Sequence, residues 1–102
     1  MNMNTYRTME LQNGQSVRLT LNLKRLLLLK SNHLDLYKEV SRIIIKGTED
    51  IMEFIKVIYA GYLCALEKGS FEMPFDEFIE VIPQDFGELA EITGDLISPK
   101  KK

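Results

Sequence analysis

The chain has 102 residues, of which 45% are hydrophobic and 27% charged, a composition typical of one ordered domain and not of a disordered protein. Its single cysteine excludes an internal disulfide, and no apolar N-terminal run resembles a signal peptide, so we expect a protein of a reducing cytoplasm. The net charge of −2 hides a split, with eight Lys or Arg and three acids in residues 1–47 against two and twelve in residues 48–99.

This split bears on the class of partner. A strongly acidic second half argues against a surface dominated by phosphate binding, so we expect no nucleic-acid partner. Opposite charges in one small domain would suit head-to-tail contact between identical subunits, because such an interface joins two different patches. A mixed, well-solvated surface is the simpler alternative.

Residues 8–21 are predicted to form a β-hairpin. A three-residue loop, Gln12-Asn13-Gly14, with Gly14 in the left-handed conformation, pairs Leu11 with Gln15 and Met9 with Val17. The apolar side chains then share one face: Met9, Leu11, Val17, Leu19 and Leu21. Because a lone hairpin is marginal in water, this face must pack on helices or join the strands of another subunit.

Two helices are predicted next, over residues 22–30 and 33–46. Asn22 caps the first, and its run from Leu26 to Leu29 is too continuous for a one-sided surface helix, so we expect these leucines to be mostly buried. Asn32 caps the second helix, and Gly47 ends it.

Residues 48–67 are predicted to form the central helix, with Thr48 as its N-cap. A narrow polar stripe runs through Glu49, Glu53 and Lys56, and the rest of the circumference is apolar, so other elements must pack on most sides. The apolar run is too short and interrupted to span a bilayer. Gly61 in its middle costs about 0.8–1 kcal/mol relative to Ala, which suggests that another backbone approaches there.

Two shorter helices complete the predicted fold. Residues 74–82 begin with Pro74 at the first helical position and end at Pro83, and residues 86–97 open with Asp85 and Glu88 in a capping-box pattern. Residues 98–102 are predicted to be a disordered tail. The expected architecture is mainly α, a single small domain of about five helices with a short N-terminal β-hairpin.

The sequence offers no set of residues for catalysis. His33 is expected at an exposed helix start, and Cys64, without a nearby cation, is expected to be inert core. No Cys or His pair has metal-ligand spacing, and no glycine-rich loop could hold phosphates. We therefore expect no enzyme, no metal and no cofactor.

An apolar cluster precedes and enters the helix at residues 74–82. Its side chains suit either core packing or the holding of a partner helix, and the pattern leaves both open. The cluster consists of Phe71, Met73, Phe75, Phe78 and Ile79.

The order of these elements carries a family resemblance. A short hairpin enters a leucine-rich helix, a helix reading Ile58-Tyr59-Ala60-Gly61-Tyr62-Leu63-Cys64-Ala65 follows, and then comes Met73-Pro74-Phe75-Asp76-Glu77-Phe78-Ile79-Glu80-Val81-Ile82-Pro83. Over about residues 9–97 the chain resembles the tail assembly chaperones of long-tailed, siphovirus-type bacteriophages and prophages of Gram-positive bacteria.

The resemblance implies a homo-oligomer that coats the helical tape measure protein and keeps it soluble until the major tail protein polymerises and displaces the coat. Such a protein would work in the host bacterial cytoplasm and be absent from the mature virion, with no membrane partner. The family has no catalytic motif to transfer, so candidate residues for self-association or partner contact follow from surface chemistry: Met9, Leu11, Val17, Leu19, Phe71, Met73, Phe75, Phe78 and Ile79.

A different class of function is the alternative. A small helical regulator would bind DNA through the basic residues Arg18, Lys24, Arg25 and Lys30.

Overall fold

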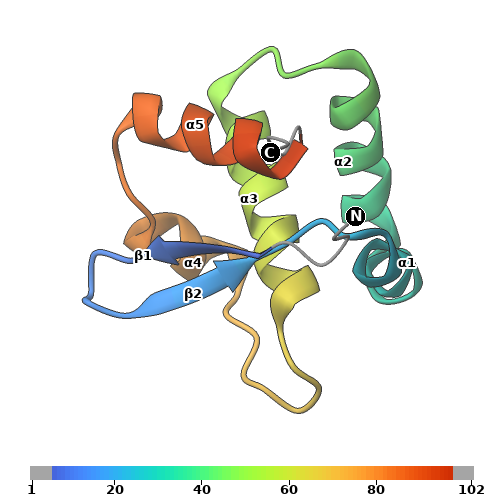
Figure 1. The fold of residues 1–102 in the computed structure, drawn as a ribbon, viewed down its shortest axis with the longest axis horizontal. Helices are drawn as coiled ribbons and strands as arrows, with labels where there is room; N and C mark the ends of the chain where they lie inside the picture. The colour runs from blue at the N-terminus through green and yellow to red at the C-terminus, as the bar shows by residue number, and fades with distance from the viewer. Residues whose placement is uncertain (1–5, 98–102) are drawn as a thin grey trace.

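The computed structural model describes residues 6–97 and is mainly helical, with a two-stranded antiparallel hairpin at its start (Figure 1). The elements in chain order are β1 (Arg7–Glu10), β2 (Ser16–Leu19), α1 (Leu23–Asn32), α2 (Leu34–Lys46), α3 (Ile51–Ala65), α4 (Phe75–Val81) and α5 (Phe86–Ile97). The predicted fold class is confirmed. The predicted tail, residues 98–102, lies outside the described residues.

The hairpin has the predicted loop and register. Met9 pairs with Val17, the Leu11 N–H donates to the Gln15 carbonyl at 2.7 Å, and Gly14 adopts a φ of +89°. Its apolar face turns inward onto the helices of the same chain, with Leu19 fully buried. The hairpin therefore completes the core of its own subunit.

Gly61 lies where the hairpin meets α3. Its carbonyl accepts a hydrogen bond from the Thr20 N–H at 3.1 Å, and a Cβ atom at this position would lie 3.4 Å from Leu19 Cβ and 3.2 Å from Leu96 Cδ1. The strand and α5 approach the helix backbone closely at this point. This contact accounts for a glycine in the middle of a helix.

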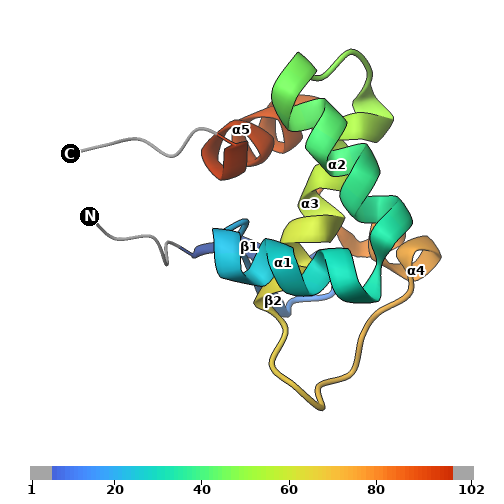
Figure 2. The ribbon, with the colours of Figure 1, turned by 90° about the vertical axis from the view of Figure 1, so that its right-hand side faces the viewer.

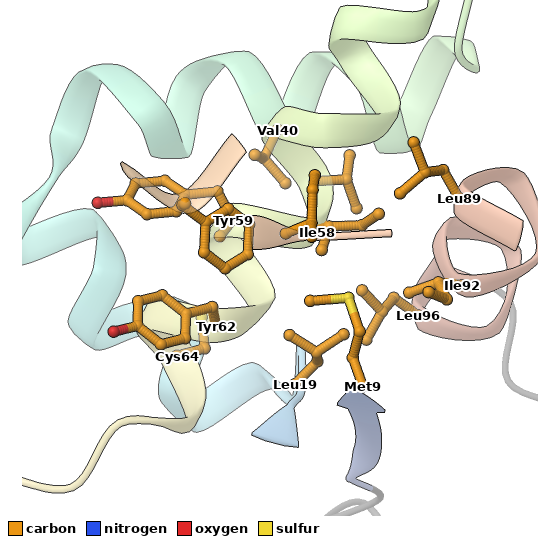
Figure 3. Packing of buried hydrophobic residues seen from close by; sticks show 14 of the residues in the cluster. Met9, Leu19, Val40, Ile58, Tyr59, Tyr62, Cys64, Leu89, Ile92 and Leu96 are labelled. Carbon is orange, nitrogen blue, oxygen red and sulfur yellow. The ribbon is translucent and has the colours of Figure 1, made fainter. Parts of the chain in front are cut away.

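The core forms around α3, which passes through the middle of the molecule (Figures 1 and 2). Figure 3 shows Met9 and Leu19 of the hairpin meeting Ile92 and Leu96 of α5 beside Ile58 of α3. Phe78 of α4 belongs to the same buried cluster. Helices and hairpin thus cover α3 on several sides, as its all-round apolar surface predicts.

Two helix starts differ from the sequence prediction. The central helix begins at Ile51, not at residue 48, because the Asp50 side chain accepts the Glu53 N–H at 3.2 Å and so caps it in place of Thr48. Pro74 is the N-cap residue of α4 and not its first helical residue.

The junction of α1 and α2 also differs from prediction. Asn32 is the last residue of α1 and does not cap α2. A single residue, His33, joins the two helices: its N–H donates to the Leu29 carbonyl, and its own carbonyl accepts the Tyr37 N–H. Because the link is this short, no separate capping residue fits between them. The predicted cap at Asn22 is confirmed, since its side chain accepts the Arg25 N–H at 2.9 Å.

The polar stripe of α3 is covered by α2. Glu53 is only 9% exposed and accepts hydrogen bonds from Arg42 at 3.0 Å and from the Glu49 N–H at 2.6 Å. These bonds, led by that from the Glu49 N–H, lower the pKa of the Glu53 carboxyl. Glu39 joins the group through Arg42 and Lys56, each at 3.4 Å or less. A charged network therefore links α2 to α3.

Candidate docking surface

The leucine run of α1 is only partly buried, contrary to prediction. Leu29 is buried and Leu26 half-buried, but Leu27 is 63% exposed and Leu28 51%. The reason is the position of α1, which lies at the edge of the molecule (Figure 1) and packs against α2 and α3 on one side. A continuous apolar run on an edge helix must send some of its side chains outward.

Two exposed side chains of α1 form what we term the leucine surface, namely Leu23 (70% exposed) and Leu27 (63%). Leu23 and Leu27 are four residues apart and so lie on the same face of the helix. The helix also carries Lys24, Arg25 and Lys30 and no acidic residue. The result is an exposed apolar stripe in a positive setting.

A hollow of about 450 Å³, here called the α1 hollow, lies between the second half of α1 and residues 66–72. Its apolar lining comes from Leu28, Leu29, Leu63, Cys64 and Leu66. Leu28 thus faces a space that the side chains of residues 6–97 do not fill.

Charged residues surround the hollow, and most of them are paired. Glu67 lies 3.4 Å from Arg18 and 3.9 Å from Arg25, and His33 Nε2 lies 3.5 Å from Glu72 Oε2. Lys68 has no ion pair with any residue in 6–97. The rim is therefore left with an unneutralised positive charge.

Cys64 sits at the base of the hollow and is buried, as predicted. Burial raises the pKa of its thiol to about 12, and the charge of Arg25 opposes this shift only in part. The prediction that no cation lies near Cys64 is wrong, because Arg25 is close enough to act on the thiol. The thiol stays protonated at neutral pH and is a poor nucleophile there.

Two tyrosines of α3 hold the segment that follows the hollow. Tyr59 donates a hydrogen bond to the Met73 carbonyl at 2.7 Å, and the Met73 N–H donates to Tyr62 Oη at 2.8 Å. Burial raises the pKa of Tyr59 to about 12, so its hydroxyl remains a donor. The rings also pack with Phe75 and Phe78 at centroid distances near 5 Å. This anchor fixes the outer wall of the hollow.

The structure divides the predicted contact residues into three groups. Buried in the core are Met9, Leu11, Leu19 and Phe78; half-buried are Val17, Met73, Phe75 and Ile79; only Phe71 is exposed. Four of the nine are thus occupied by the chain's own packing, and we exclude them from the candidate surface. Leu23, Leu27 and Leu28 were not among the predicted contact residues, although the four-residue spacing of Leu23 and Leu27 beside lysines indicates one exposed helix face.

Among residues 6–97, no three His, Cys, Asp or Glu side chains are grouped so that they could hold a metal ion. No helix in that range has the length and apolar character needed to cross a membrane. Comparison of the chain with protein-family models, curated proteins and solved structures finds no match.

Proposed function

We propose that the chain is a non-enzymatic tail assembly chaperone of a long-tailed phage or prophage, which self-associates and coats the tape measure protein. The leucine surface is the observation that supports this proposal most, together with the resemblance over residues 9–97. Exposed leucines on a rigid helix offer an apolar stripe to the apolar face of a cargo helix. Such contact removes apolar surface of both partners from water.

The size of the surface suits a reversible coat. Full burial of one leucine contributes about 1.5–3 kcal/mol, so the few leucines of one subunit hold cargo weakly. Many copies along one rod, linked to one another, bind far more tightly than any single copy. A polymerising major tail protein can then displace subunits one at a time in the host cytoplasm, leaving none in the virion.

The test is co-expression with the tape measure protein of the phage or prophage that encodes this chain. We expect the wild-type chain to move that protein into the soluble fraction, and the double variant L23E/L27E to lose the effect. I45E is the matched control, because Ile45 is an equally exposed apolar residue (79%) on α2, outside the leucine surface. A tape measure protein that stays insoluble with the wild-type chain would contradict the proposal.

The structure gives no support to the DNA-binding alternative. Arg18 and Arg25, two of its four basic residues, are directed to Glu67. The remaining Lys24 and Lys30 alternate with exposed leucines, which a phosphate backbone would leave in water.

A further inference from the structure

An acidic surface with an exposed aromatic side chain lies at the start of α5. Residues 69–97 contain eight acids and no Lys or Arg. Phe86, the first residue of α5, is 66% exposed between Asp85 and Glu88. Neither of these acids has an ion pair within the described part of the chain. Phe86 is thus a large apolar side chain that the fold leaves in water, in a negative setting.

We propose that Phe86 of one copy inserts into the α1 hollow of a second copy and joins the two head to tail. The inference rests on the self-association in the proposed function and names its two surfaces. It is separate from cargo binding, which uses Leu23 and Leu27 on another part of α1.

The two surfaces match in shape and in chemistry. The hollow has room for one aromatic ring, and Leu28 and Leu63 line it with apolar atoms. At its rim Glu67 faces Arg25 and Glu72 faces His33, while Lys68 has no ion-pair partner in residues 6–97. Phe86, in contrast, is flanked by Asp85 and Glu88. Apolar contact at the centre with opposite charges at the rim is the usual anatomy of a specific interface.

The placement of the two surfaces determines the type of assembly. In Figure 1 the start of α5 lies at the left edge of the molecule and α1 at the right edge. A contact between such separated patches leaves a free Phe86 at one end of each dimer and an empty hollow at the other. Growth by further copies follows, in contrast to a two-fold dimer, which would stop at two.

The experiment is light scattering on the purified full-length chain over a concentration series at low and high salt. We expect a mass that rises with concentration and falls with salt, because screening weakens the charged rim. F86E and L28E should each reduce the mass to that of a monomer. Both residues are more than half exposed, so each variant should fold, which circular dichroism checks, and I45E serves as the control that keeps the wild-type mass.

A mixture of the two variants gives the sharper result. F86E retains the hollow and L28E retains Phe86, so an equimolar mixture should form a heterodimer that does not grow. A monomeric wild-type chain, variants that keep the wild-type mass, or a mixture that stays monomeric would each overturn the inference. Failure of cargo binding is distinguishable, since L23E/L27E retains Phe86 and the hollow and should keep the wild-type mass in light scattering while losing tape measure solubility.

Discussion

The helices α1 and α3 are both rich in apolar side chains, yet the fold treats them in opposite ways. In α3, nine of the fifteen residues are buried, whereas in α1 only Leu29 of ten is buried. The hairpin, α2 and α5 all pack against α3, while α1 has neighbours on one side only. Apolar content alone therefore does not separate a core helix from a helix that presents a surface.

The difference has a consequence for function. Leucines that stay exposed after folding lower the solubility of a protein. A contiguous exposed apolar surface therefore commonly marks a site of contact with another molecule. In α3 the apolar residues stabilise the subunit. In α1 the outward leucines contribute little to folding, and this division can be tested residue by residue.

The largest effect is expected from the inner side of α1. L29A should lower the free energy of unfolding by about 2–5 kcal/mol, because it removes buried atoms and leaves a cavity. L27A, two residues away on the same helix, should change the free energy of unfolding by less than about 0.5 kcal/mol, since Leu27 is mostly in water. Urea unfolding followed by circular dichroism measures both. Equal losses would show that the two sides of α1 are not distinct.

A smaller effect is expected where the hairpin approaches α3. G61A gains helix propensity but drives a Cβ to within 3.2–3.4 Å of Leu96 and Leu19, so we expect a net loss of about 1–3 kcal/mol. G94A in α5 is the matched control, because nothing lies within 4 Å of its added Cβ, and it should stabilise by about 0.5–1 kcal/mol. Stabilisation by G61A would mean that the strand is free to move away.

The sequence predicts the fold where several local signals agree. The hairpin register follows from Gly14 and from the alternation of Met9, Val17 and Leu19, which only one loop length places on one face. Gly61 likewise signals a close contact, because a mid-helix glycine has a known cost. These features depend on neighbours in the chain and can be read without tertiary structure.

Features that depend on distant residues could not be read in this way. A run of leucines from 26 to 29 is apolar in every helical direction, so its pattern does not show which side faces water. The α1 hollow joins α1 to residues 63–72, and the burial of Glu53 depends on Arg42 of another helix. Only the packing of the helices brings these groups together.

The smallest effect, at neutral pH, is expected at the charged network between α2 and α3. The pKa of Glu53 is lowered in the folded chain, so its contribution to stability is present above the carboxyl's ordinary pKa and is lost as pH falls through the folded value. E53Q removes this charge, so the urea midpoint should fall at pH 7 and decline less steeply than wild type below about pH 5. Some acid dependence should remain, because Lys56 and Arg42 also lower the pKa of Glu39.

E77Q is the control, because it makes the same change at an exposed α4 position without an ion pair in residues 6–97. It should leave the wild-type pH profile of the urea midpoint unchanged. Parallel pH profiles for E53Q and wild type would mean that the covered polar stripe of α3 is held by packing and not by charge.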